Sequence, residues 1–374
     1  MTPSMSAPSI SAADVRAVAA VVKSGRLALG PCAAAFERRF AEYVGTRHAV
    51  AVSSGTAGLH IAAAAAGLGP GDEVITSTFS FVASANAFVY LGARPRLVDI
   101  DPVTLMPDAA AIRAAVTRRT RAIVTVDIFG NPADADAIAP VARRHDLAVI
   151  EDACEAVGSE YRGRPAGALG DAGVFGFYPN KQITTGEGGM IVTNRRDWDA
   201  LMRSLRNQGR DIHDAWITHS RIGFNYRMNE MSAALGLSQL GRIDRLLAAR
   251  RRVAAAYGRR LRAVAGVELP VPLSTTTRMS WYIYAIRLAR DLDRDRVMVE
   301  LARCGIPTRA YFSPIHLQAP YRERFGFRKG QFPAAEAAAR RIVALPFHGK
   351  MTGREIDLVA KALSKVISMR AARR

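Results

Sequence analysis

The chain has 374 residues, of which 49% are hydrophobic and 23% charged, and its formal net charge is +19. This length is too great for one small core, so we expect two domains or one large domain with an appendage. No run approaches the ~18 uninterrupted apolar residues of a membrane span, and the first 20 residues carry Asp14 and Arg16 without the apolar core of a signal peptide. These features predict a cytoplasmic globular protein without a membrane segment.

The cysteines and histidines do not indicate a disulfide framework or a metal site. The three cysteines, Cys32, Cys154 and Cys304, are far apart, odd in number and without CxxC spacing. His213 and His219 lie six residues apart in a polar stretch, which matches no common spacing of metal ligands. We interpret both histidines as loop residues and expect no bound metal.

The positive charge comes mainly from arginine. Six of the 52 basic residues are lysines, which leaves 46 arginines. Such a charge fits nucleic-acid binding, an anionic small substrate or a genome biased toward arginine codons. The arginines are spread through the chain and no DNA- or RNA-binding motif accompanies them. We therefore expect no nucleic-acid partner.

Short apolar strands alternate with helical segments from residue 48 onward. Helices are predicted at 56–67, 81–91, 108–116 and 134–145. Strands are predicted around them, at 48–54, 72–77, 94–100, 121–129, 147–153, 173–177 and 189–193. Such alternation is typical of a mostly parallel sheet covered by helices, so the sequence predicts an α/β domain.

The pattern changes in the last third of the chain. One long helical period runs from residue 229 to about residue 264. Beyond it we expect one half-buried strand and two helices, at 280–288, 293–304 and 353–366. The chain is therefore predicted to form a large domain over residues 1–250, with an N-terminal arm, and a smaller α+β domain over residues 251–374.

One lysine stands apart from the others. Lys181 lies in the stretch FYPNKQITTGEGG and is the only lysine between Lys23 and Lys329, in a chain that otherwise uses arginine. An amine can lose its proton and attack a carbonyl, which a guanidinium cannot do. Lys181 is therefore a candidate nucleophile, and the alternative is an ordinary exposed lysine.

Ligands of doubly wound sheets bind beyond the carboxyl ends of the strands, so residues at these ends are candidate site residues. Gly55 and Thr56 follow the first strand and begin a helix, which is typical of phosphate binding, although a plain N-cap gives the same pattern. Asp152 ends another strand beside Glu151. A carboxylate at such a position can pair with a cationic ring nitrogen or cap a helix.

Two further residues complete the candidate set. Phe81 follows the strand at 72–77, where it can offer a flat face to a planar cofactor or belong to the core. Asn225 lies in a polar loop before the long helical segment, where a cap or turn residue is expected. Together with Lys181, the candidates supply an amine, an anion for a ring nitrogen, a stacking face and a phosphate cradle.

These features, in this order, resemble the pyridoxal 5′-phosphate (PLP) enzymes of the aspartate-aminotransferase fold, type I, and most closely the nucleotide-sugar aminotransferases of DegT/StrS type. The similarity covers nearly the whole chain and includes SGRLALGP, SSGTAGLH, GPGDEVITSTFSFVASANA, VDIDPVTLMPD, EDACEAVGSEYRGR, FYPNKQITTGEGGMIVTN, GFNYRMNEMSAALGLSQL, SPIHLQAPYRERFG and ALPFHGKMT. It implies a PLP-dependent transferase type I fold, with a mostly parallel sheet in the large domain and a smaller α+β C-terminal domain.

The resemblance implies roles for individual residues. Lys181 would form the Schiff base with PLP, and Asp152 would pair with the pyridine nitrogen. Phe81 would stack on the ring, while Gly55 and Thr56 would hold the phosphate.

Other implied roles concern the neighbouring subunit and the substrate. Asn225 would reach across a dimer interface to the partner's phosphate, which implies a homodimer with two shared active sites. His316, and Tyr311 in the same segment, would line the substrate side.

The chain departs from the family pattern at two positions. The family commonly has a phosphate-binding serine five residues before its lysine, where this chain has Gly176. Three residues after the aspartate, near the phenolic oxygen of the cofactor, a glutamine or histidine is common, and this chain has Glu155. A carboxylate facing a phenolate is repelled unless one of the two is protonated.

The resemblance implies an aminotransferase that moves an amino group from an amino acid, expected to be glutamate, to a keto-deoxysugar on a nucleoside diphosphate. Some members replace the lysine with histidine and perform dehydration, so the retained Lys181 favours transamination. Two alternatives remain: amination of a keto-cyclitol or another antibiotic precursor, and a PLP-binding regulator without turnover.

Overall fold

The computed structural model describes residues 3–211 and 218–371, so His213 lies outside the described residues. A seven-stranded sheet in the order β1-β9-β8-β5-β4-β2-β3 forms the centre of the molecule. Its strands are β1 (His48–Val52), β2 (Glu73–Ser77), β3 (Arg94–Val98), β4 (Thr120–Val126), β5 (Ala148–Asp152), β8 (Ala172–Gly176) and β9 (Gly189–Thr193). Only β9 runs antiparallel to its neighbours, which confirms the predicted mostly parallel sheet.

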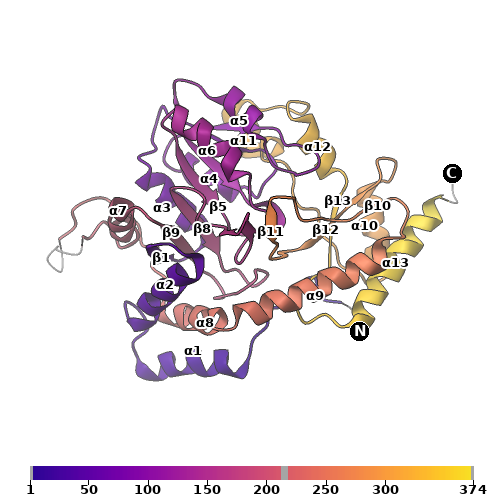
Figure 1. Ribbon diagram of the computed structural model, residues 1–374, viewed down its shortest axis with the longest axis horizontal. Coiled ribbons are helices and arrows are strands. Elements are labelled where there is room, and N and C mark those ends of the chain that lie inside the picture. Colours follow the sequence, from indigo (N-terminus) through magenta and orange to yellow (C-terminus); the bar gives the residue numbers. More distant parts are fainter. Residues whose placement is uncertain (1–2, 212–217, 372–374) are drawn as a thin grey trace.

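Helices cover both faces of this sheet (Figure 1). One face packs against α3 (Gly55–Ala65), α4 (Ala83–Val89) and α7 (Arg196–Arg206). The other packs against α2 (Pro31–Val44), α5 (Ala109–Ala115) and α6 (Ala135–Arg144), with the short turn η1 (Ile128–Gly130). Successive side chains of a strand point to opposite faces. Val50 and Val52 therefore pack in the core beneath α3, whereas Ala49 and Ala51 pack in the core beneath α2.

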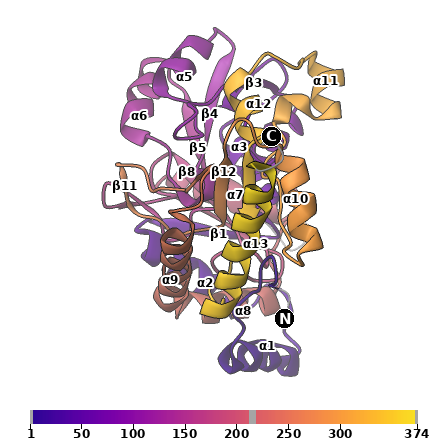
Figure 2. The same cartoon turned by 90° about the vertical axis from the view of Figure 1, so that its right-hand side faces the viewer.

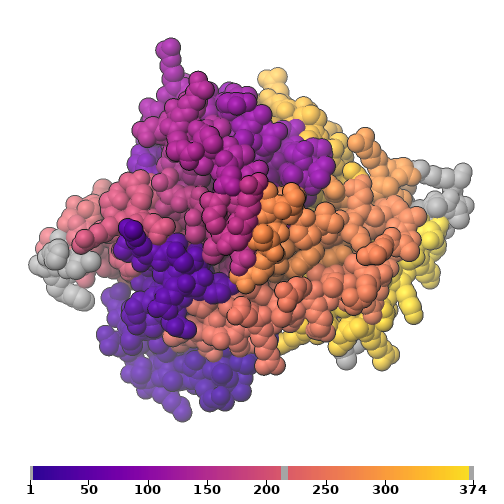
Figure 3. Space-filling model, in the orientation of Figure 1, coloured from indigo at the N-terminus to yellow at the C-terminus, as the bar shows by residue number. Residues whose placement is uncertain are grey.

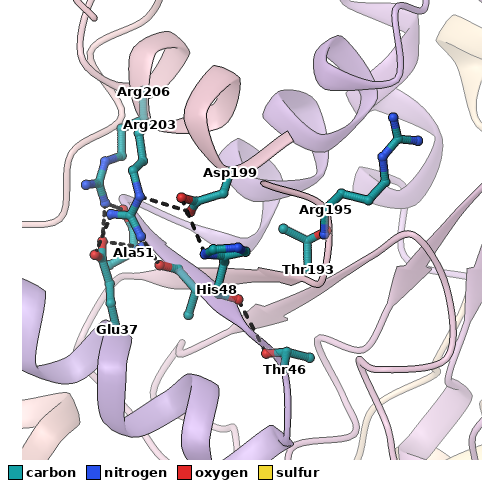
Figure 4. Close-up of polar contacts among 10 residues, drawn as sticks. Glu37, Thr46, His48, Ala51, Thr193, Arg195, Asp199, Arg203 and Arg206 are labelled. Carbon is teal, nitrogen blue, oxygen red and sulfur yellow. Dashed lines mark hydrogen bonds and ion pairs between the residues drawn. The ribbon is translucent and has the colours of Figure 1, made fainter. Parts of the chain in front are cut away.

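Charged side chains occupy the free edge of β1, the strand that leads into α3 (Figure 4). Glu37 of α2 accepts a hydrogen bond from the Ala51 amide at 2.9 Å, while Arg203 and Arg206 of α7 donate to the carbonyls of Ala49 and Ala51 at 2.7 Å. Both arginines also pair with Glu37; burial would raise the pKa of this carboxyl, but their charges lower it. The network shields the edge strand and fixes its end.

A second, smaller sheet lies in the C-terminal part of the chain. It consists of β10 (Val267–Glu268), β12 (Tyr284–Leu288) and β13 (Ile342–Leu345) and packs with α9 (Ile243–Leu261), α10 (Arg294–Arg303) and α13 (Gly353–Ala371) (Figure 2). The predicted boundary at residue 250 falls inside α9. Leu246 and Leu247 pack in the core beneath α2, whereas Val253 and Tyr257 pack in the core of the small sheet, so α9 connects the two cores.

Several C-terminal segments return to the large sheet. β11 (Thr276–Arg278) pairs with β6 (Glu160–Tyr161), which pairs in turn with β7 (Arg164–Pro165), and Figure 3 shows the corresponding orange and magenta surfaces in contact. Three further elements bring apolar residues to the large-domain cores, namely η2 (Ile315–Leu317), α11 (Ala319–Phe325) and α12 (Pro333–Ala339). The two parts therefore share an extensive boundary.

The N-terminal arm connects distant parts of the fold. Its helix α1 (Ala12–Ser24) lies apart from the sheet and packs on α8 (Glu230–Leu240) (Figure 1). The buried Asp14 accepts hydrogen bonds from Ser238 Oγ at 2.7 Å and Gln239 Nε2 at 2.8 Å. Before α1, the Met5 carbonyl accepts a bond from the Phe347 amide at 3.1 Å, which ties the arm to the small domain.

Three predicted elements differ from the structure. The single helix predicted from 229 to about 264 is wrong, because the chain breaks into α8 and α9 at Arg242, whose backbone leaves the helical region (φ −131°, ψ 21°). The strand predicted from residue 280 begins only at Tyr284, since Trp281 adopts a positive φ of 55°. The last helix continues to Ala371. None of the described helices combines the length and hydrophobicity needed to cross a membrane.

Candidate active site

A cavity of about 340 Å³ lies at the carboxyl ends of the parallel strands. Its walls come from the start of α3, the loop after β2, the end of β5 and the loop after β8. Seven of the candidate site residues line it, namely Gly55, Thr56, Phe81, Asp152, Glu155, Lys181 and Tyr311, and so does Gly176. Parallel strands that end at one edge of a sheet bring together residues that are far apart in the chain.

Lys181 follows β8, and its side chain is only 13% exposed. Its Nζ lies 3.9 Å from Glu155 Oε1 and 4.0 Å from the ring centroid of Tyr282. The buried Arg250 donates hydrogen bonds to the carbonyls of Lys181 at 2.7 Å and Tyr282 at 3.1 Å. Arg250 therefore fixes the backbone of Lys181 and that of Tyr282 relative to each other.

Asp152 and Glu151 are adjacent at the end of β5 but point to opposite faces of the sheet. Asp152 lines the cavity, where its carboxylate accepts hydrogen bonds from Ser84 Oγ at 2.6 Å and from the Cys154 amide at 3.2 Å. Glu151 is buried on the other face and accepts a bond from the Gly167 amide at 2.6 Å. The alternation of the strand thus places one of the two acids in the cavity.

Glu155 is held between a backbone amide and the lysine. Its Oε2 accepts a hydrogen bond from the Phe129 amide at 2.8 Å, while Oε1 faces Lys181. Burial raises the pKa of Glu155 to about 7, although the charge of Lys181 opposes the shift. The group therefore changes its charge near neutral pH.

The first turn of α3 forms a wall of backbone beside the cavity. A β-carbon at Gly55 would lie 2.8 Å from Cys154 Sγ and 3.3 Å from Gly176 Cα, so this position has room only for glycine. Ser54 caps the helix by accepting a bond from the Ala57 amide at 3.1 Å. Other amides in the first turn of a helix have no partner within the helix and bind anions readily.

Aromatic side chains form another wall. Phe81 leaves 59% of its surface exposed, and its ring centroid lies 6.3 Å from that of Phe312. Tyr311 and Phe312 line the cavity together with Phe81. Such a flat apolar surface can stack against a planar ring.

Asn225 does not line the cavity of its own chain. It is exposed in the segment between α7 and α8, where the rings of its neighbours Phe224 and Tyr226 stack at 5.0 Å. The Phe224 ring also packs on His60, with centroids 4.5 Å apart. The segment is therefore held on its apolar side, and the contact of Asn225 with a second subunit stays a prediction.

His316 also lies outside the cavity, in contrast to the position expected for it. The residue is fully buried, with Nδ1 at 2.7 Å from Thr78 Oγ1 and Nε2 at 3.0 Å from Glu336 Oε1. The Ile315 amide donates to the Thr78 carbonyl at 2.7 Å, so this segment folds beneath the loop after β2. Both ring nitrogens are engaged in the interior, and only Tyr311 of the two expected substrate residues borders the cavity.

Several residues around the cavity were missed in the sequence. Ser84 follows Phe81 by three positions, but its contact with Asp152 joins residues 68 positions apart. Tyr282 and Arg250 come from the C-terminal part, and no local pattern distinguishes them. Within residues 3–211 and 218–371, no group of three or more side chains is arranged to hold a metal ion.

Comparison with known proteins gives consistent matches. The DegT/DnrJ/EryC1/StrS aminotransferase family matches residues 8–364. The chain is 45% identical over 334 residues to the GDP-perosamine synthase of Caulobacter vibrioides, which covers 89% of each protein. The solved structure of DesV from S. venezuelae has a TM-score of 0.88 and 35% identity, with 94% of this chain and 93% of that chain covered.

A further solved structure contains the cofactor predicted from the sequence. The PLP form of the putative sugar aminotransferase Spr1654 from Streptococcus pneumoniae has a TM-score of 0.93 and 26% identity, with 99% of both chains covered. These structural neighbours confirm the predicted fold of PLP-dependent aminotransferases. Because the family match extends over nearly the whole sequence, the chain belongs to the DegT/DnrJ/EryC1/StrS aminotransferase family.

Proposed function

We propose that the protein is a PLP-dependent aminotransferase that transfers the amino group of an amino acid to a keto-deoxysugar carried by a nucleoside diphosphate. The observation that carries this proposal is the cavity that joins Lys181, Asp152 and the start of α3. The C. vibrioides relative is named for GDP-perosamine, which supports a nucleotide-linked sugar as the substrate class. Glutamate is the proposed donor.

The residues around the cavity fit PLP. The amides at the start of α3 and the Thr56 hydroxyl would hold the phosphate against the backbone wall at Gly55. Asp152 would pair with the pyridine nitrogen, and Phe81 would cover one face of the ring. When bound, PLP would supply an aldehyde carbon that takes up the amino group and a ring that accepts the electrons left on Cα when its proton departs.

The protein side chains would control the protons. When neutral, Nζ of Lys181 can accept the proton released from Cα of the amino donor. Tyr282 and Glu155 confine this amine to one side of the cavity. Asp152 would keep a negative charge beside the ring nitrogen, so that this nitrogen retains its proton during the transfer.

The half-reaction tests the proposed function. The purified protein should take up PLP with visible absorbance, lose this absorbance on addition of glutamate and release 2-oxoglutarate. A nucleotide keto-sugar from a panel should then restore it. Bound PLP that never exchanges with glutamate would instead indicate a regulator, and restoration only by keto-cyclitols would move the substrate to that class.

We expect the affinity for PLP to fall as the pH rises through 7, because of Glu155. Below pH 7 the carboxyl is protonated and tolerates the anionic phenolic oxygen, whereas above pH 7 it is charged and repels it. The dissociation constant should increase by up to about tenfold per pH unit above 7. Absorbance titrations with PLP between pH 6 and 8.5 measure this slope.

The control for this titration is Glu155→Gln, which keeps the shape of the side chain and has no proton to lose. PLP itself also titrates, so the informative quantity is the difference between the two proteins. A pH dependence that is identical in wild type and Glu155→Gln would contradict the assignment.

We also propose a homodimer in which Asn225 contacts the phosphate bound by the partner. Without the usual serine, the phosphate site has fewer donors, so Asn225→Ala should weaken PLP binding by roughly 10- to 150-fold, the equivalent of about 1.5–3 kcal/mol. Gly176→Ser should partly restore the affinity. A β-carbon at Gly176 would lie 3.5 Å from Cys154 Sγ, an ordinary contact, so the position has room for a side chain.

Asn229→Ala provides a matched control for Asn225→Ala. Asn229 is exposed in the same segment, but its side chain caps α8 by accepting a bond from the Ser232 amide at 2.8 Å. Its loss should cost about 1 kcal/mol of stability and leave the PLP affinity unchanged.

Sedimentation tests the shared site directly, because PLP should favour the dimer. A monomer that binds PLP as tightly as the dimer would refute the shared site.

A further inference from the structure

The carboxylate of Asp152 has one hydrogen-bond donor on each oxygen. Ser84, a fully buried residue in the first turn of α4, donates from Oγ to Oδ2 at 2.6 Å, and the Cys154 amide donates to Oδ1 at 3.2 Å. Two donors on different oxygens restrict the rotation of a carboxylate. The structure thus fixes the direction in which Asp152 faces the cavity.

A second serine extends this contact. Ser80 Oγ lies 2.7 Å from Ser84 Oγ, and Ser80 lines the cavity whereas Ser84 does not. Ser84 donates its single hydroxyl proton to Asp152, so the Ser84 oxygen accepts from Ser80. The contact with Asp152 therefore orders both hydroxyls in one direction.

The same short segment carries the ring-stacking candidate. Phe81 lies between the two serines in the sequence, and the Ser84 amide donates to the Phe81 carbonyl at 3.2 Å. One turn therefore connects the aromatic face of the cavity with the support of the carboxylate. A shift of this turn would displace both.

We propose that Ser84 is a positioning residue for Asp152, which orients the carboxylate toward the ring nitrogen of the cofactor. This inference depends on the proposed function, because Asp152 receives its role there. Ser84 does not line the cavity, so it would act through Asp152. Ser80 supports Ser84 and has a smaller effect, since Ser84 can still donate to Asp152 when Ser80 is replaced.

The test compares Ser84→Ala, Ser84→Thr and Ser80→Ala in the holoenzyme. Ser84→Ala should lower kcat by about 10- to 100-fold and leave KM for both substrates within about threefold, because the misplaced charge affects the chemical step more than binding. Ser84→Thr keeps the hydroxyl and should recover most of the rate. Ser80→Ala should lower kcat by less than about fivefold. This variant remains informative if the extra methyl group prevents Ser84→Thr from folding.

A spectroscopic measurement distinguishes positioning from a purely structural contact. With ¹⁵N-labelled PLP, the chemical shift of the ring nitrogen reports its protonation. Ser84→Ala should move this shift toward the value of Asp152→Asn. The matched control is Ser238→Ala, which removes another serine that donates to a buried aspartate, Asp14, at 2.7 Å but lies outside the cavity. Its shift and kcat should equal those of wild type.

A double-mutant cycle completes the test. In the Asp152→Asn background, Ser84→Ala should cost less than about twofold, because the charge that it orients is absent. Equal losses in both backgrounds, or an unchanged ring-nitrogen shift in Ser84→Ala, would overturn the positioning role. Full activity of Asp152→Asn would instead refute the role of Asp152, so failure of the proposed function and failure of this inference give different results.

Discussion

Replacement of Lys181 by arginine or alanine is expected to lower the rate of amino transfer by at least about 10³-fold while the fold remains intact. Arginine keeps the positive charge but has no accessible neutral form, so it can neither attack the aldehyde of the cofactor nor accept a proton. The fold should persist because Arg250 binds the backbone carbonyl at position 181, which neither substitution removes.

The measurement combines the visible spectrum with PLP, the rate of the glutamate half-reaction and thermal unfolding. Lys361→Arg is a matched control, since Lys361 is an exposed lysine on α13 that does not line the cavity. It should behave as wild type in all three measurements. Turnover near the wild-type rate in Lys181→Arg would show that another group carries the amine chemistry.

The large domain could be predicted from the sequence because its signals are local. Strands such as β2 and β5 are short apolar runs, and helices such as α3 begin just after a strand at a small residue. The break between α8 and α9 could not be predicted, because the apolar period continues across Arg242 while the backbone turns. Hydrophobic periodicity reports burial, and the first part of α9 is buried in one core and the rest in another.

The candidate site was predictable where chemistry and strand ends coincide. Lys181 is conspicuous because the chain avoids lysine, and Asp152 because it ends a strand. Residue type alone does not show which of the two acids, Asp152 or Glu151, faces the cavity. The alternation of side chains along β5 places Asp152 there. Gly55 was recognised as part of a helix start, and its contact with Cys154 and Gly176 gives the physical reason for glycine.

The positions of other site residues could not be predicted, because they depend on contacts between segments that are distant in the sequence. His316 is buried because Thr78 and Glu336 bind both of its nitrogens, and no local pattern reveals partners 238 and 20 positions away. Tyr282 contacts Lys181 from a segment that was predicted as strand, whereas the strand begins only at Tyr284. For Asn225 the decisive partner would belong to a second subunit, so neither the sequence nor a single chain determines its contacts.

The second large effect is expected at Asp152. Asp152→Ala and Asp152→Asn should still bind PLP through the phosphate site but lose at least about 10²-fold in rate, because a ring nitrogen without a negative partner loses its proton and the ring becomes a poor electron acceptor. The asparagine variant is the sharper test. It keeps the shape of the side chain and an oxygen that can accept from Ser84, and it removes the charge.

Glu151→Gln gives the matched control, because it removes a neighbouring carboxylate that lies on the opposite face of the same strand. Glu151 accepts bonds from the amides of Gly167 and Leu169, so its replacement should lower the melting temperature. The rate per folded enzyme should stay close to that of wild type. Single-turnover rates with glutamate, measured at saturating PLP, compare the variants directly. An active Asp152→Asn would refute the role of Asp152, whereas a Glu151→Gln that is folded but inactive would place the essential carboxyl group on the other face of the sheet.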